Sequence, residues 1–283
     1  MTKVLVTGAS GFVGKKLCSE LINSGYQVFT LKSNDGDISE PSVFRHIPVE
    51  DIKHVFHLAA RSFVPESWEK SLEYYRVNVI GTQNVLEYCR KTGAALTFVS
   101  SFVYGTDLKL PVSESHKIEP ANPYAHSKYL AEQLCEFYHK NFDVRLSIIR
   151  PFNIYGSGQK QSFLVPHIIQ QVKNASEVRV KTLIPKRDMV FLDDLVNALI
   201  LTIPLKDSFT IFNIGSGYSL SVREIIEIIQ RVMGTNKPIK SEKEIRKNEI
   251  ADVVADIQYA NVKMKWKPNY SFEEGITKIL AEQ

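Results

Sequence analysis

A tyrosine and a lysine four residues apart, Tyr124 and Lys128, stand in the stretch PYAHSK. Positions i and i+4 of a helix share one face, so the phenol and the ammonium could act on one reacting atom. A nearby ammonium favours the phenolate, and we expect it to lower the pKa of Tyr124 from its usual value of about 10. Such a tyrosine can give or take a hydroxyl proton during hydride transfer. His126 lies inside the motif, and we expect it to be exposed or hydrogen-bonded rather than a base.

Two serines precede this pair in the segment FVSSFVYG. Ser100 ends an apolar run that predicts a strand, and Ser101 follows it. A hydroxyl at the carboxyl end of a strand faces the ligand crevice of a doubly wound sheet. These serines could also simply cap the next turn, so their chemistry depends on what else the fold brings to that crevice.

A glycine-rich turn lies near the start of the chain, in VLVTGASGFVG. Gly8, Gly11 and Gly14 follow a predicted strand and open a helix with apolar periodicity. Glycines at these places let backbone N–H groups approach a pyrophosphate at the positive end of the helix dipole. Nucleotide binding is therefore expected at this turn.

Strand and helix patterns alternate through the first half of the chain. Helices that separate buried strands indicate right-handed βαβ units and a parallel sheet. We therefore predict an α/β fold, a Rossmann-type doubly wound parallel sheet with a smaller interleaved C-terminal substrate lobe. The expected strands cover 4–7, 28–31, 54–58, 96–100, 146–150, 190–192 and 210–214, and the expected helices cover 14–24, 74–92, 124–141 and 222–233. The expected domains are 1–155 with 188–215 for the dinucleotide, and 156–187 with 216–283 for the substrate.

The composition excludes several functions. The net charge is +4, and the basic segment 237–247 alternates signs, so no nucleic-acid patch is predicted. The cysteines, Cys18, Cys89 and Cys135, lack the spacing of a metal site, and free thiols are expected. The longest apolar run, 195–205, is too short to span a bilayer, and the first strand leaves no room for a signal peptide. We expect a soluble, cytoplasmic protein that binds no metal and no membrane.

The form TGASGFVG, together with SSFVYG and YAHSK, resembles the extended short-chain dehydrogenases/reductases, whose members include nucleotide-sugar epimerases, dehydratases and reductases. The resemblance continues through HLAA at 57–60, RPFN at 150–153, RDMVFLDD at 187–194 and RKNEI at 246–250. It also covers the closing AD and WKP segments, although Lys265 replaces a glycine of that pattern.

This resemblance implies roles for individual residues. The implied catalytic residues are Ser100, Tyr124 and Lys128. The implied cofactor-binding residues are Gly8, Ser10, Gly11, Phe12, Val13, Gly14, Lys32, Asp37, Ile38, Leu58, Ala59, Ala60, Asn78, Tyr124 and Lys128. The implied substrate-binding residues are Ser62, Ser101, Phe102, Asn153, Arg187 and Arg246. The helices over 74–92 and 124–141 resemble those that pair in the homodimers of this family.

The residues after Ser100 argue against two of the reactions that this family carries out. Members that dehydrate sugars carry acidic residues where this chain has Ser101 and Phe102, and a phenylalanine cannot move a proton. Double epimerisation would need a Cys/His pair, and these positions supply no cysteine. Redox chemistry at carbon 4 of a nucleotide-linked hexose remains, as a ketoreductase or as a 4-epimerase.

Lys32 bears on the choice between these two reactions, because it bears on which cofactor is bound. It stands where NAD-preferring members have an Asp that binds the ribose hydroxyls, and its ammonium could instead pair with a 2′-phosphate. Alternatively Lys32 points to water and Asp35 turns back to the ribose. NADP(H) is preferred on this reasoning, with NAD(H) possible. We therefore favour an NADPH-dependent reductase of an NDP-4-keto-6-deoxyhexose over an NAD-retaining UDP-hexose 4-epimerase. A non-catalytic NADP-sensing protein is disfavoured because Tyr124 and Lys128 are both present.

Overall fold

The computed structural model describes residues 1–47, 51–243 and 249–282. The chain forms two compact units, each discontinuous in sequence. The first unit comprises Met1–Tyr104, Lys117–Pro151 and Val196–Phe212. The second comprises Gly105–His116, Phe152–Leu195 and Asn213–Gln283. Each unit has its own hydrophobic core.

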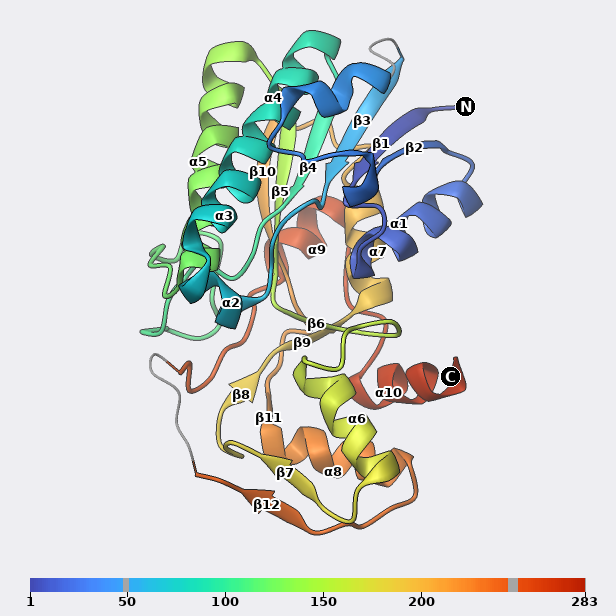
Figure 1. Ribbon diagram of the computed structural model, residues 1–283, viewed down its shortest axis with the longest axis vertical. Coiled ribbons are helices and arrows are strands. Elements are labelled where there is room, and N and C mark those ends of the chain that lie inside the picture. The colour runs from blue at the N-terminus through green and yellow to red at the C-terminus, as the bar shows by residue number, and fades with distance from the viewer. Residues whose placement is uncertain (48–50, 244–248, 283) are drawn as a thin grey trace. The chain divides into compact units, whose positions relative to one another are not determined.

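A parallel sheet of six strands, in the order β10-β5-β4-β3-β1-β2, is the centre of the first unit (Figure 1). The strands are β1 (Lys3–Thr7), β2 (Gln27–Leu31), β3 (Ile52–His57), β4 (Ala95–Val99), β5 (Leu146–Pro151) and β10 (Phe209–Ile214). The strand β1 pairs with both β2 and β3, so Val4 lies opposite Val28 on one side and His54 on the other. Strand order reverses beside β1, and the carboxyl ends of β1 and β3 therefore form the crevice where such sheets bind ligands. The predicted Rossmann-type fold is confirmed.

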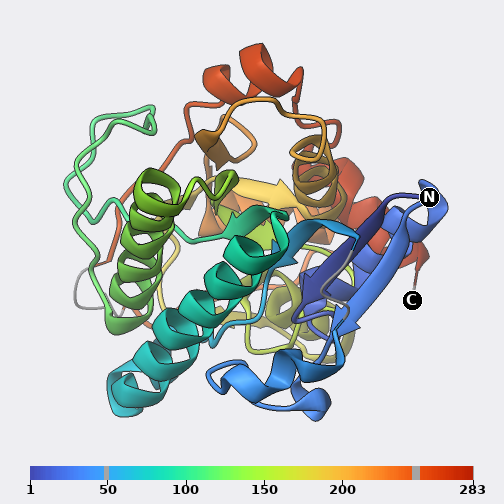
Figure 2. The same ribbon diagram turned by 90° about the horizontal axis from the view of Figure 1, so that it is seen from above.

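Helices cover both faces of this sheet (Figure 2). The elements between the strands are α1 (Phe12–Asn23), two 3-10 turns η1 (Ser33–Asp35) and η2 (Pro41–His46), α2 (Val64–Glu69), α3 (Ser71–Tyr75), the π-helical turn η3 (Arg76–Ile80), α4 (Gly81–Thr92), α5 (Pro123–Phe142) and α7 (Leu192–Leu201). Buried Leu5, Val55 and Leu96 pack with residues of α4 and α5 in one core, and Leu17 and Leu21 of α1 are fully buried. The helix expected over 74–92 is thus divided by a π turn, which apolar periodicity does not reveal.

The second unit packs three helices around its own core. Its main helices are α6 (Leu164–Asn174), α8 (Val222–Val232) and α10 (Phe272–Ala281), with α9 (Gln258–Met264) beside them in sequence. Its short strands are β6 (Asn153–Tyr155), β7 (Val178–Val180), β8 (Lys186–Arg187), β9 (Met189–Phe191), β11 (Leu220–Ser221) and β12 (Ile239–Ser241). Ser221 caps α8 by accepting a hydrogen bond from the Glu224 N–H, and the Glu224 carboxylate accepts one from Ser221 N–H. Ser221 and Glu224 therefore form a capping box at the start of α8.

Cys18, Cys89 and Cys135 are free thiols. Within the described part of the chain, each helix is too short or too polar to cross a membrane.

Candidate active site

The glycine-rich turn joins β1 to α1, and its backbone lies close to the backbone at Leu31 and Ala59. Gly8 N–H donates to Leu31 O at 2.8 Å, which ties the turn to the end of β2. A Cβ on Gly14 would lie 2.2 Å from Gly8 O, and one on Gly8 would lie 2.7 Å from Ala59 N, so neither position accepts a side chain. Gly11 is the N-cap of α1, which has no side-chain cap and no acid in its first turn. The first N–H groups of α1 are therefore left for an anion.

The remaining residues predicted in this turn flank those glycines. Ser10 is exposed, and Phe12 and Val13 are half-buried in the first turn of α1.

Lys32 follows β2 directly and is exposed. Its backbone N–H donates to Asp35 Oδ2 at 2.7 Å, so this carboxylate closes its own 3-10 turn. The Lys32 ammonium acts on Cys18 of α1: burial raises the pKa of this thiol, and the Lys32 charge lowers it by a smaller amount. Lys32 therefore presents a positive charge on the α1 side of β2.

Asp37 and Ile38, two of the residues predicted to bind the cofactor, are in contact with other residues of the first unit. Asp37 accepts hydrogen bonds from Ser39 N–H at 2.9 Å and from its hydroxyl at 2.7 Å, and pairs with Arg76 at 2.7 Å. These contacts, with the Ser39 backbone first, lower the pKa of Asp37. Ile38 is buried, and a Cβ on Gly81 would lie 2.7 Å from its Cγ2.

Asn78 connects the loop after β3 to the helix that carries the tyrosine. Its Oδ1 accepts from Arg61 N–H at 2.9 Å, and its Nδ2 donates to Arg61 O at 3.1 Å and to Ser127 Oγ at 2.9 Å. Ser127 Oγ in turn donates to Tyr124 O at 2.7 Å. The predicted residues Leu58, Ala59, Ala60 and Ser62 belong to this loop; the first three are half-buried, and Ser62 is exposed. Asn78 therefore fixes the backbone between the cofactor loop and α5.

The predicted catalytic residues lie in the first unit, at the carboxyl end of β4 and on the first two turns of α5. Ser100 and Ser101 are buried, and the Ser100 hydroxyl oxygen has no hydrogen-bond partner among the described residues. Lys128 is 2% exposed, and its ammonium lies 4.1 Å from the centroid of the Phe98 ring. The half-buried Tyr124 ring meets Tyr74 edge to face at 6.4 Å.

The expectation that Lys128 lowers the pKa of Tyr124 is wrong for this structure. Burial raises the pKa of Tyr124 to about 12, and the neighbouring Ser101 hydroxyl offsets this only in part. Burial also lowers the pKa of Lys128 to about 7, against the opposing charges of Cys135 and Glu132. Desolvation therefore dominates at both groups, and it favours the neutral form of each.

A buried ion pair stands one turn beyond Lys128. Glu132 of α5 accepts from Arg150 Nε at 3.0 and 3.2 Å and pairs with its second guanidinium nitrogen at 2.6 Å. Arg150 also donates to Tyr104 Oη at 2.9 Å. The sequence motifs predict no role for Glu132, although its place four residues after Lys128 puts it on the same helix face. The pair joins α5 to β5 beside the catalytic residues.

Phe102 follows the two serines and packs edge to face on Tyr104 at 5.4 Å. It carries no group that could exchange a proton with a substrate.

The second unit holds two of the predicted substrate residues. Asn153 donates from its backbone and from Nδ2 to Asp188 O, each at 3.1 Å. Arg187 donates to Ile250 O at 2.7 Å and pairs with Glu249. The buried Asp188 carboxylate accepts hydrogen bonds from Ser216, Gly217 and Ala255 and so fixes this region. The third predicted residue, Arg246, lies outside the described residues.

Within residues 1–47, 51–243 and 249–282, no group of three His, Cys, Asp or Glu side chains could hold a metal ion.

Comparison with known proteins identifies the family. Residues 4–215 match the NAD dependent epimerase/dehydratase family. The chain belongs to this family. A putative UDP-glucose 4-epimerase of Methanocaldococcus jannaschii is 31% identical over 98% of this chain and 97% of its own. The GDP-6-deoxy-D-mannose reductase of Pseudomonas aeruginosa is 28% identical over 99% of this chain and 96% of its own.

A solved structure supports the same family. RMD from Pseudomonas aeruginosa, determined in complex with NADPH, aligns with a TM-score of 0.89 and 28% identity. The alignment covers 100% of this chain and 98% of the other. The chain is therefore an NAD(P)-dependent enzyme of the epimerase/dehydratase family.

The residues present fit a nicotinamide dinucleotide. Side chains are excluded at Gly8 and Gly14, and the uncapped start of α1 offers N–H groups to a pyrophosphate. The buried hydroxyl of Ser100 has no hydrogen-bond partner among the described residues, as expected where a substrate oxygen completes the hydrogen bond. The cofactor, when bound, donates or accepts the hydride. Tyr124 can then exchange the proton of the reacting oxygen, to which Ser100 can donate a hydrogen bond.

Proposed function

We propose that the protein is an NADPH-dependent reductase acting at carbon 4 of a nucleotide-linked 4-keto-6-deoxyhexose. The observation that carries the NADPH preference is Lys32 at the end of β2, where its exposed ammonium is available to a 2′-phosphate. Asp35 accepts the Lys32 N–H, and Asp37 is held by Ser39 and Arg76, so both nearby acids already have partners.

In the proposed chemistry, bound NADPH would supply the hydride to carbon 4, and side chains of the protein would supply the proton and hold the oxygen. Tyr124 gives its proton to the carbon-4 oxygen, Ser100 hydrogen-bonds that oxygen, and Lys128 supplies positive charge as the phenolate forms. Phe102 cannot act in a dehydration, which favours simple reduction. We further propose that Arg187 and Asn153 bind the diphosphate of the nucleotide sugar, because a guanidinium suits that group.

The assignment of segments to ligands is also a proposal. Residues 1–155 with 188–215 would bind the dinucleotide, and residues 156–187 with 216–283 would bind the nucleotide sugar, in the cytoplasm.

A second candidate is an NAD-retaining UDP-hexose 4-epimerase. The 31% identity to a putative UDP-glucose 4-epimerase favours it, and Ser100, Tyr124 and Lys128 serve either reaction. In an epimerase the cofactor is regenerated in each turnover, whereas a reductase consumes it.

Stoichiometry separates the two candidates. The purified protein is incubated with UDP-, GDP- and dTDP-linked hexoses and with their 4-keto-6-deoxy forms, with NADPH or NADH. Oxidation of one NADPH per keto sugar reduced supports the reductase. Interconversion of two hexoses without net change in cofactor refutes it and supports the epimerase.

Lys32→Asp tests the cofactor preference. It removes an attractive charge and adds a repulsive one, so the ratio of kcat/KM with NADPH to that with NADH should fall about tenfold or more. Lys53→Asp makes the same charge change near the amino end of β3 and is the matched control. An equal ratio in the two variants would mean that Lys32 does not contact the ribose phosphate.

We also propose that the protein is a homodimer paired through α4 and α5. These helices pack side by side, and Phe137 on α5 is 53% exposed. Phe137→Glu should dissociate the dimer in sedimentation velocity, and a wild-type monomer at micromolar concentration would refute the proposal.

A further inference from the structure

His57 ends β3 and is 1% exposed, yet neither catalytic nor cofactor contacts had been expected of it. Its Nε2 lies 3.0 Å from Thr82 Oγ1, and Thr82 Oγ1 donates to Asn78 O at 2.6 Å. A carbonyl can only accept, so the single Thr82 hydroxyl proton is committed to Asn78. His57 must therefore carry its proton on Nε2 and donate it to Thr82.

The other ring nitrogen follows from this assignment. Burial, with a smaller contribution from the Lys128 charge, lowers the pKa of His57 to about 3, so the imidazole is neutral. With the proton on Nε2, Nδ1 accepts from Thr7 Oγ1 at 2.7 Å. Thr7 Oγ1 in turn accepts from Ala59 N–H at 3.2 Å. The hydrogen bonds thus form one series from Ala59 through Thr7, His57 and Thr82 to Asn78. Each donor in the series has one acceptor, and all donors point toward Asn78.

Both ends of this chain reach backbone at the proposed cofactor and catalytic residues. At one end, Ala59 belongs to the loop whose backbone lies so close to Gly8 that it excludes a Cβ there. At the other end Asn78 holds both backbone groups of Arg61 and the hydroxyl of Ser127. His57 joins the two halves of this series, because Nδ1 contacts Thr7 (the Thr7 arm) and Nε2 contacts Thr82 (the Thr82 arm).

We propose that His57 is a positioning residue, which acts as a fixed Nε2–H imidazole linking the cofactor loop at Ala59 to Asn78 and α5. The proposal rests on the proposed function, because it assigns these segments to cofactor binding and turnover. The Thr7 arm would set cofactor affinity, and the Thr82 arm would set the turnover number.

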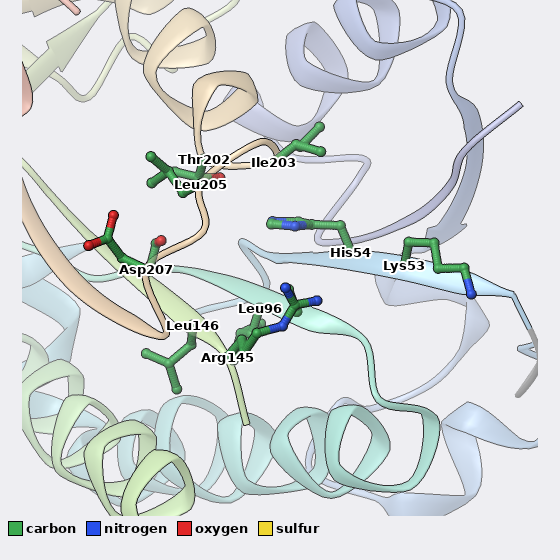
Figure 3. Close-up of a pocket in the computed structure, with 11 residues that line it drawn as sticks. Lys53, His54, Leu96, Arg145, Leu146, Thr202, Ile203, Leu205 and Asp207 are labelled. Atoms are coloured by element: carbon green, nitrogen blue, oxygen red, sulfur yellow. The ribbon is translucent and has the colours of Figure 1, made fainter. Parts of the chain in front are cut away.

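The same strand supplies a matched control near its amino end. His54 Nε2 lies 2.6 Å from Thr97 Oγ1, which lies 2.5 Å from Thr202 Oγ1, and Thr202 donates to Leu199 O at 2.7 Å. By the same counting of protons, His54 is also an Nε2–H imidazole. Figure 3 shows His54 and Thr202 at a cavity of about 140 Å³ at the amino ends of β3, β4 and β5, away from the crevice. The hydrogen-bonded series of His54 is as buried as that of His57, but it contacts none of the proposed site residues.

The first test removes one buried hydroxyl from each chain. Thr82→Val and Thr97→Val each leave an imidazole N–H without an acceptor, so both should lose stability to urea by a similar amount. Only Thr82→Val should lower kcat, by about tenfold or more, because Asn78 is then misplaced. Equal kcat in the two variants would overturn the proposal.

The second test separates the arms. The Gln side chain in His57→Gln can place an amide near Nε2 and keep the bond to Thr82, whereas the Asn in His57→Asn can place its oxygen near Nδ1 and keep the bond from Thr7. His57→Gln should retain kcat and weaken NADPH binding, measured by the fluorescence of the bound nucleotide. His57→Asn should retain NADPH affinity and lower kcat. Parallel losses of both quantities in both variants would contradict separate arms.

A direct measurement checks the protonation. Long-range proton–nitrogen NMR spectra of histidine-labelled wild type should report neutral Nε2–H rings for His54 and His57 at pH 6. An Nδ1–H or charged His57 would overturn the proposal without touching the proposed function. A wild type that binds neither NADPH nor NADH would overturn both.

Discussion

Removing the carboxylate of Glu132 should lower the free energy of unfolding far more than removing one surface charge would. Glu132 and Arg150 are each 4% exposed, and three nitrogen–oxygen distances between them lie from 2.6 to 3.2 Å. Glu132→Leu leaves the Arg150 guanidinium buried with its main counter-charge gone. Lys128 is a second buried basic group one turn away, so the region would hold two basic groups without that carboxylate.

The loss of unfolding free energy in Glu132→Leu depends on the burial of the Arg150 charge rather than on the number of contacts removed. Breaking a buried ion pair by removing one partner costs about 3–5 kcal/mol, because the remaining charge cannot be hydrated. This is a large share of a total stability of about 5–15 kcal/mol. Replacing both partners, as Glu132→Leu with Arg150→Met, removes the stranded charge. The double variant should therefore recover to within about 2 kcal/mol of wild type.

Urea unfolding followed by circular dichroism measures these differences as shifts of the midpoint at constant slope. The control is Glu136→Leu on the same helix, which breaks an exposed pair with Lys140 and should cost less than about 1 kcal/mol. If the double variant is as unstable as the sum of its two single variants, burial of charge is not the cause. If Glu132→Leu costs no more than Glu136→Leu, the pair is not buried in solution.

Three further outcomes are expected. Gly14→Ala should abolish NADPH binding in fluorescence titrations, because its Cβ would lie 2.2 Å from Gly8 O. Tyr124→Phe should lower kcat by orders of magnitude while the NADPH dissociation constant stays near that of wild type, since only a proton-transfer group is lost. Burial lowers the pKa of both His54 and His57 to about 3, so the unfolded chain binds more protons than the folded one between about pH 6.5 and 3. Stability should therefore fall as pH falls through that window, by about 2 kcal/mol per histidine at pH 5 relative to pH 8, and His57→Gln should remove about half of this dependence in urea titrations.

The sheet and its binding turn could be predicted because their signals are local. A buried strand, three glycines at fixed spacing and an apolar helix together specify the turn at Gly8 to Gly14, where added side chains would collide with backbone. The strands were expected within one or two residues of their observed ends, since each is a short apolar run closed by polar residues.

The connections that tune the site depend on distant segments and could not be predicted. His57 and Thr82 lie 25 residues apart and Thr7 lies 50 residues from His57, so no spacing rule relates them. The π turn over 76–80 keeps the apolar period of a helix closely enough to be hidden in the sequence. The direction of the pKa shift at Tyr124 was missed for a similar reason, because the i, i+4 spacing reports proximity but not burial.

Burial at Tyr124 and Lys128 bears on the protonation state of the two side chains. A phenol whose pKa is raised to about 12 keeps its proton at neutral pH, which is the form needed to protonate a ketone oxygen. Lys128, with its pKa lowered to about 7, lies close to its point of titration and can be charged as Tyr124 loses its proton. Because Ser100, Tyr124 and Lys128 serve either reaction, the proposed reduction rests on Lys32 and not on the protonation of these two side chains.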